Sequence, residues 1–113
     1  MNGPFKLVNW MGDSLERVRA FSNDARQDIG FALDRVQRGQ EPPDWKPMPS
    51  VGPGVMEIRV HAGNEHRLFY VTKFADAIYV LHVFVKKTRK TLTTDIELGR
   101  KRYQALLREV HLK

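Results

Sequence analysis

VMEIRVHAGNEHRLFYVTKFADAIYVLHVFVK, residues 55–86, predicts a β-meander. Apolar and polar side chains alternate from Val55 to His61, which is the pattern of a strand with one buried face. Residues 62–65 have the composition of a hairpin turn, and two more strands are expected over 66–73 and 77–86. The last strand is apolar on both faces, so we expect it to be central in an antiparallel sheet and covered on both sides.

Upstream of the meander the pattern is mainly helical. A strand is expected over 5–10, and Asp13 with Glu16 resembles a capping box that opens a short helix. A second, longer helix is expected to open at the cap cluster Ser22-Asn23-Asp24 and to end at Gly39. The alternative is one kinked helix through both segments.

Residues 41–54 hold five prolines and are expected to form a loop. Trp45 and Met48 are expected to fold back from this loop onto the core. Downstream of the meander, Thr94 and Glu97 form another capping box before a helix with one apolar stripe. The element order predicts one α+β domain over 1–113, in which an N-terminal helix pair and a C-terminal helix pack on an antiparallel sheet.

The charge is concentrated in the second half of the chain. The 113 residues include 19 Lys and Arg against 13 Asp and Glu, a net charge of +6. Residues 59–108 hold eleven basic and four acidic groups, whereas residues 1–58 hold seven and eight. A one-sided positive field suits nucleic acid or an acidic protein partner, although a soluble protein with a high pI would show it too. No signal peptide or membrane span is expected, and the absence of cysteine suits a reducing cytosol.

The densest basic run follows the third strand of the meander. Lys86, Lys87, Arg89 and Lys90 lie within five residues, so they repel one another and create an oxyanion site suited to phosphate. In such a site a lysine can also donate or accept a proton. The alternative is a solvated turn that keeps the end of the strand soluble.

Two arginines flank the predicted hairpin. Arg59 and Arg67 lie at similar distances from its tip, so we expect them to be close in space and able to bind a phosphodiester. The alternative is that they form surface ion pairs with Glu57 or Glu65.

The remaining candidates are aromatic side chains and one histidine. Tyr70 and Phe84 are expected in the core, with stacking on RNA bases as the alternative. His82 shares the strand face of Lys86 and is either a buried core residue or a general acid or base. The chain has no cysteine and its histidines are scattered, so no metal site is predicted.

Several segments together resemble the RelE/HigB-like toxins of type II toxin–antitoxin modules, and most closely their branch of phage-derived addiction-module killer proteins. The matching segments are 49–57, the Ile58-Arg59-Val60 that follows, 67–71, 73–82 and 84–88, and they carry the patterns E-I-R, R-x-x-Y and F-x-K-K-T.

The resemblance implies the RelE/ParE fold and a cytoplasmic bacterial toxin that a helix-turn-helix antitoxin neutralises, in a hetero-tetramer or larger complex. It also implies metal-independent endoribonuclease action on mRNA, usually on the ribosome and without a cofactor, in which the 2′-hydroxyl of the RNA attacks the adjacent phosphate. On matching positions, Arg59 and Arg67 would clamp the phosphate, and Lys86 or Lys87 would stabilise charge and assist proton transfer. Tyr70 would stack on a base or act as an acid, His82 is a further catalytic candidate, and the residues expected to bind RNA around them are Lys73, Phe84, Arg89 and Lys90.

Two other functions remain open on the same residues. A ParE-like toxin would inhibit a protein target such as DNA gyrase without cutting RNA, and an accessory protein would bind nucleic acid with no activity of its own. The basic run beside the paired arginines favours the ribonuclease.

Overall fold

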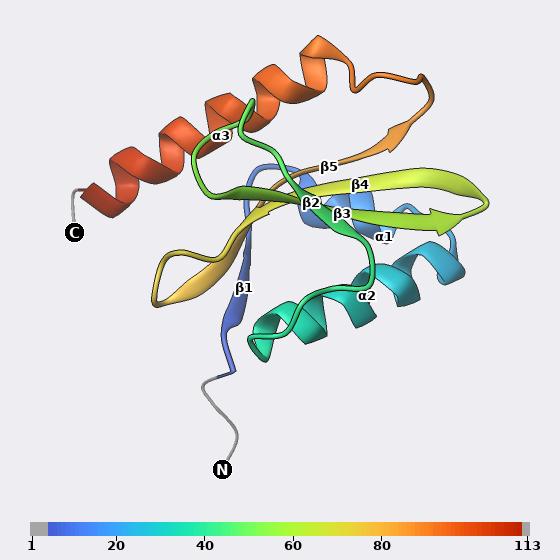
Figure 1. Ribbon diagram of the computed structural model, residues 1–113, viewed down its shortest axis with the longest axis horizontal. Helices are drawn as coiled ribbons and strands as arrows, with labels where there is room; N and C mark the ends of the chain where they lie inside the picture. The colour runs from blue at the N-terminus through green and yellow to red at the C-terminus, as the bar shows by residue number, and fades with distance from the viewer. Residues whose placement is uncertain (1–4, 112–113) are drawn as a thin grey trace.

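The computed structural model describes residues 5–111 as an α+β fold with a five-stranded sheet (Figure 1). Two helices precede the meander and one follows it, as the sequence predicts. The elements in chain order are β1 (Leu7–Trp10), α1 (Ser14–Arg19), α2 (Asn23–Gln37), β2 (Trp45–Pro47), β3 (Val55–Ala62), β4 (Asn64–Val71), β5 (Ala77–Lys86) and α3 (Thr93–His111). No helix within residues 5–111 is long and apolar enough to span a membrane.

The sheet has the strand order β1-β5-β4-β3-β2. The meander β3-β4-β5 is antiparallel, as predicted, and β1 adds to β5 as a parallel edge strand. The hairpin turn is tighter than the sequence suggested, because Ala62 pairs with Asn64 and β4 therefore begins two residues early. Gly63 makes this possible, since its φ of 77° is a left-handed conformation that suits glycine.

One extra residue in β5 changes which side chains face each layer. Phe69 of β4 pairs with His82, but the next residue, Tyr70, pairs with Val80, so Leu81 bulges between them. As a result two consecutive residues, Leu81 and His82, face α3, whereas Val80 and Val83 on either side of them pack in the core on the other face. β5 is buried on both faces, which confirms that it is covered from both sides.

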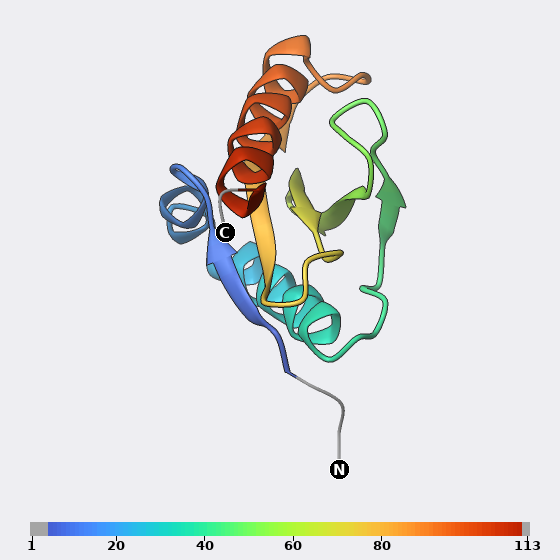
Figure 2. The ribbon, with the colours of Figure 1, turned by 90° about the vertical axis from the view of Figure 1, so that its left-hand side faces the viewer.

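The helices cover opposite faces of the sheet. Figures 1 and 2 show α3 on one side of the strands and α2 on the other. The core under α1 and α2 is built around Ile29, Leu33, Ile58 and Leu68. The core under α3 is built around Phe69, Leu81, Tyr103 and Leu106, which confirms the predicted stripe on the last helix.

The two N-terminal helices begin in different ways. Ser22 caps α2 as predicted, because its hydroxyl accepts a hydrogen bond from the Ala25 amide. The predicted capping box at Asp13 is wrong, since the Asp13 carboxylate makes no capping bond and instead binds Arg17 and Arg102. Arg17 above all, and then Arg102, lower the pKa of Asp13 to about 2.

The proline-rich segment is a loop only in part. Trp45–Pro47 forms the edge strand β2 on β3, so the prediction of a loop throughout 41–54 is wrong. An edge strand tolerates proline because one side of it needs no hydrogen bond to a neighbour. Met48 is buried in the α3 core and Trp45 is half-buried, so both side chains return to the domain as expected.

Gly52 lies where a side chain has no room. A Cβ at this position would approach Cδ2 of the Tyr103 ring to 2.5 Å, whereas a Cβ at Gly30 in α2 would meet nothing within 4 Å. We expect Gly52→Ala to lower the free energy of unfolding by about 1–3 kcal/mol through overpacking. The control Gly30→Ala should raise it by about 0.5–1 kcal/mol through helix propensity. Urea denaturation of both variants measures the difference, and equal stabilities would contradict the close packing of Tyr103.

Candidate cationic site

The sheet register brings the predicted basic residues to one end of one face. Arg59 pairs with Arg67, and Arg67 pairs with Phe84 of β5. Two residues further toward the hairpin tip, on the same face, Glu65 pairs with Lys86. These residues alternate with the strand residues that face α2, so they share the α3 side of the sheet. The prediction that the two arginines are close is confirmed.

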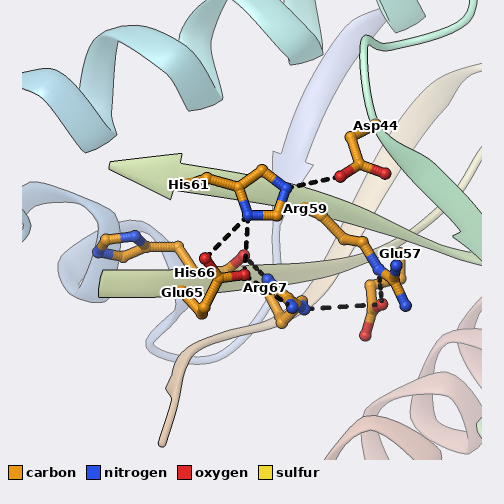
Figure 3. A network of polar contacts seen from close by, with 7 residues as sticks. All are labelled: Asp44, Glu57, Arg59, His61, Glu65, His66 and Arg67. Carbon is orange, nitrogen blue, oxygen red and sulfur yellow. Dashed lines mark hydrogen bonds and ion pairs between the residues drawn. The ribbon is translucent and has the colours of Figure 1, made fainter. Parts of the chain in front are cut away.

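A buried carboxylate lies between the two arginines (Figure 3). Glu57 is 1% exposed, and its Oε1 is 3.1 Å from Nε of Arg59 and 3.8 Å from Nε of Arg67. Arg67 also reaches Oε1 of Glu65 at 3.0 Å and donates to the carbonyl oxygen of His66 at 3.0 Å. The ion pairs with Glu57 and Glu65, which the sequence left as an alternative, are therefore present.

The two arginines differ in what they can still bind. The side chain of Arg67 is 7% exposed, so its guanidinium is enclosed by Glu57, Glu65 and main chain. The side chain of Arg59 is 30% exposed and has Glu57 as its carboxylate partner. Arg59 can therefore contact a phosphate from solvent, while Arg67 supports the carboxylates around it.

His61 fixes the outer part of the same network. Its Nε2 is 2.6 Å from Oδ2 of Asp44, and its Nδ1 is 2.8 Å from Oε1 of Glu65 (Figure 3). Both carboxylates favour the imidazolium, Asp44 most, and they raise the pKa of His61. His61, with Arg67 second, in turn lowers the pKa of Glu65. Acidic and basic side chains therefore alternate along this network, in the order Asp44, His61, Glu65, Arg67 and Glu57.

The basic run after β5 is free of such contacts. Lys86 is half-buried at the end of the strand, and Lys87, Arg89 and Lys90 are exposed. Among residues 5–111, none of these four forms an ion pair. The hydroxyl of Thr88 donates to the carbonyl oxygen of Lys90 at 2.6 Å and closes the turn between them. The run therefore presents cations that are available to an anionic ligand.

Two predicted site residues lie elsewhere. Tyr70 belongs to the core under α2, on the opposite face of the sheet from Arg59. Lys73 follows the far end of β4, where its ammonium donates to the Tyr103 hydroxyl at 2.7 Å and lies near the Pro53 carbonyl oxygen. The structure does not bring either side chain together with the arginines and Lys86.

His82 and Phe84 are core residues on the α3 face. His82 is 1% exposed, and its Nε2 is 2.8 Å from Oδ1 of Asp95 at the start of α3. Burial lowers the pKa of His82, although Asp95 acts in the opposite direction. Phe84 is 3% exposed and stacks on His82 with ring centroids 5.1 Å apart. The sequence left two interpretations of each residue, and the burial of both side chains supports the interpretation as core residues.

The organising role of Glu57 was missed by sequence reasoning. Glu57 was assigned to the polar face of its strand, yet it is among the most buried side chains. The sequence did contain a signal for the ion pair of Glu57 with Arg59, because residues two apart on a strand project from the same face. Lys46, which pairs with Glu57 from β2 and is exposed, adds a cation that sequence reasoning also missed. In the described part of the chain, no group of three His, Cys, Asp or Glu side chains is placed to hold a metal ion.

Together these features define a small α+β protein with a cationic end on one sheet face and a buried carboxylate between two arginines. The family model described as Phage derived protein Gp49-like (DUF891) matches residues 16–104, so the chain belongs to that family. The family is associated with the toxins of addiction modules, that is, of toxin–antitoxin systems. Among curated proteins, none matches the chain.

Removal of the Glu57 carboxylate tests the buried network. We expect Glu57→Ala to cost about 3–5 kcal/mol of unfolding free energy, because it leaves Arg67 as a buried charge with fewer partners. The half-exposed Glu65 is the control, and Glu65→Gln should cost less than about 1 kcal/mol. Chemical denaturation measures both. A cost for Glu57→Ala no larger than that for Glu65→Gln would contradict the central role of Glu57.

The two bonded histidines should respond to pH in opposite directions. The raised pKa of His61 means that its stabilisation is complete below pH 6.5 and is lost as pH rises through its folded pKa. The lowered pKa of His82 means that its stabilisation is complete above pH 6.5 and is lost as pH falls toward its folded pKa. His61→Gln should therefore cost more stability at pH 5.5 than at pH 8, and His82→Gln should cost more at pH 8. Urea denaturation at both pH values checks this, and parallel pH trends would refute it.

Proposed function

We propose that this protein is a toxin that cleaves mRNA at the cationic end of its sheet. The observation that carries the proposal is the basic run 86–90, whose four cations have no ion pair in the described chain. Lys86 and the partly exposed Arg59 lie toward the same end of one sheet face, with β4 between their strands. Membership of a toxin–antitoxin-associated family supports a toxin with an antitoxin partner. The proposed antitoxin has a helix-turn-helix domain, and the proposed place of action is the translating ribosome in the cytoplasm.

The proposed reaction uses the RNA itself as the nucleophile. The 2′-hydroxyl oxygen forms a bond to the adjacent phosphorus, and the bond from phosphorus to the 5′-oxygen breaks. Extra negative charge develops on the phosphoryl oxygens in the transition state, and fixed cations stabilise it. Arg59, Lys86 and Lys87 supply that charge, and an ammonium of Lys86 or Lys87 protonates the departing 5′-oxygen. The proton of the 2′-hydroxyl passes to a water molecule.

The other predicted residues do not take part in the proposed chemical step. Arg89 and Lys90 bind the flanking phosphates, because they are exposed on the turn after Lys87. Arg67 positions Glu57 and Glu65 and does not touch the RNA. His82 and Phe84 support the strand end from the core. Tyr70 and Lys73 are left out of the proposed site, since they lie on another face and at another end of the sheet.

A second candidate function is inhibition of a protein target such as DNA gyrase, as by ParE-like toxins. It is favoured by the burial of both His82 and Tyr70, which removes the two predicted acid–base candidates other than the lysines. A cationic surface without acid–base chemistry would suit an acidic protein surface.

Expression without the antitoxin tests the proposed function. We expect growth arrest with cut cellular transcripts, and we expect Arg59→Gln with Lys86→Gln to restore growth because the phosphate loses its cations. Arg26→Gln with Arg108→Gln removes the same charge from exposed positions on α2 and α3 and should remain toxic. Primer extension on cellular mRNA and a supercoiling assay separate the two functions. Intact transcripts with inhibited supercoiling would reject the ribonuclease in favour of the gyrase inhibitor.

The salt dependence of RNA binding tests the place of Lys87. If Lys87 contacts a phosphate, Lys87→Gln should reduce the slope of log K against log salt by roughly one unit. Titrations of a single-stranded RNA at several salt concentrations measure the slope. Arg108→Gln serves as the matched control and should leave the slope unchanged. An unchanged slope for Lys87→Gln removes this lysine from the site.

A further inference from the structure

A hollow lies on the face of the sheet opposite to Arg59, at the C-terminal end of α2. Its volume is about 500 Å³, and residues from α2, from the segment before β2 and from strands β2, β3 and β4 line it. The apolar part of the lining comes from Val36, Pro42, Trp45, Met56 and the ring of Tyr70. A hollow of this size with an apolar wall and few polar groups has the form of a binding site. The proposed cleavage function does not use it.

Tyr70 contributes an unused hydrogen-bond donor to this hollow. The side chain is 3% exposed and lines the cavity, yet its hydroxyl bonds to no other residue within 5–111. Burial above all, and then the charge of Glu41, raise the pKa of Tyr70 to about 12, so the hydroxyl keeps its proton at neutral pH. The hydroxyl is therefore free to donate to an acceptor that enters the hollow.

Lys6 contributes a charged donor on the same lining. Its ammonium donates to the carbonyl oxygens of Thr72 at 2.6 Å and Phe74 at 2.9 Å, which fixes its place. An ammonium has three donors, so one is left over, and Lys6 forms no ion pair with another described residue. The Tyr70 hydroxyl and the Lys6 ammonium are two donors in an apolar hollow. They favour a ligand that has an apolar part and a hydrogen-bond acceptor, and the charge of the ammonium favours an anionic acceptor.

The rim extends the apolar surface beyond the hollow. Phe5 is 52% exposed, and the guanidinium of Arg38, a lining residue, lies 5.3 Å from the centre of its ring. Arg38 pairs with Asp34, and Glu41 accepts a hydrogen bond from Trp45. A ligand confined to the hollow would leave Phe5 in water, whereas a polypeptide would cover both. Lys6 and Arg38 outnumber Glu41 among the charged lining residues, which favours a polypeptide of opposite charge.

We propose that this cavity docks an acidic segment of a partner polypeptide, which places one large aromatic side chain in the hollow. A carboxylate or main-chain carbonyl of the segment accepts hydrogen bonds from the Tyr70 hydroxyl and the Lys6 ammonium. The aromatic ring packs on Trp45 and Met56, where it leaves water. The site is on the face opposite to Arg59, so the partner and a nucleic acid would not compete for the same side chains.

The probe is the peptide acetyl-Glu-Asp-Trp-Asp-Glu-amide, titrated into the isotopically labelled full chain and followed by amide NMR. We expect shifts at Gln37, Tyr70 and Thr72, and at least about tenfold weaker binding when the tryptophan of the peptide is replaced by alanine. Tyr70→Phe should weaken binding about two- to tenfold through one lost hydrogen bond. Lys6→Gln should weaken it most at low salt, whereas Lys87→Gln, with the same charge loss on the other face, should change it by less than about twofold.

Several results would overturn the proposal. Shifts confined to the surroundings of Arg59 and Lys86, or equal affinity for the alanine peptide, would mean that general charge attraction holds the probe. Equal affinity for N-acetyltryptophan would make the occupant a free aromatic acid, and self-association that shifts the same amides would make it a second copy of the chain. The peptide comparison needs only the wild-type protein, so it decides the matter even if Tyr70→Phe does not fold. RNA cleavage is measured separately, and its presence or absence does not bear on this result.

Discussion

The buried carboxylate of Glu57 is the constraint around which the polar face of the hairpin is arranged. A carboxylate with 1% exposure is stable only when cations surround it, and Arg59 and Arg67 supply them from the same strand and from its partner. The register Arg59↔Arg67 makes this possible, because both guanidiniums then reach back toward one point. Arg67 becomes an internal residue as a consequence, and Arg59 is left as the arginine that solvent can reach.

The bulge at Leu81 changes which residues of β5 face each of the two helical layers. Without the extra residue the strand would keep strict alternation, and Val83 would face the same side as Leu81. The bulge also leaves a carbonyl oxygen that needs a donor, and Arg102 of α3 donates to it at 2.9 Å. The same guanidinium binds Asp13 before α1 at 2.7 Å. One side chain thus joins the C-terminal helix, the central strand and the start of the N-terminal helix pair.

The sequence was sufficient for features that depend on local periodicity. The meander, the Ser22 cap and the stripe with Tyr103 and Leu106 follow from alternation, helical spacing and capping chemistry. β2 was missed because three residues in a proline-rich segment carry no alternation, and only the edge of β3 makes them a strand. Asp13 was predicted to be a cap from its spacing to Glu16. Its actual partner Arg102 is 89 residues away in the sequence, and local spacing does not reveal such a contact.

The location of the candidate site could be predicted from the sequence, but which of its side chains are exposed could not. Cross-strand pairing follows from the position of a hairpin turn, so the closeness of Arg59 and Arg67 could be derived. Arg67 is the more buried of the two and lies on β4, between β3 and β5, and this strand order is a tertiary property. Tyr70 was separated from the site by strand alternation alone, since even-numbered residues of β4 face α2 while Arg67 and Phe69 face α3.

The distribution of carboxylates decides which cations are available for a ligand. Each acidic group of the hairpin already has a basic partner, so Arg59, Arg67 and His61 share Glu57, Glu65 and Asp44. The basic run has no carboxylate within it, and its cations repel one another across a short turn. Bringing a phosphate to this turn relieves that repulsion, whereas bringing one to Arg67 would require breaking two ion pairs. The lysines after β5, more than the buried arginine, are therefore where an anionic ligand gains the most.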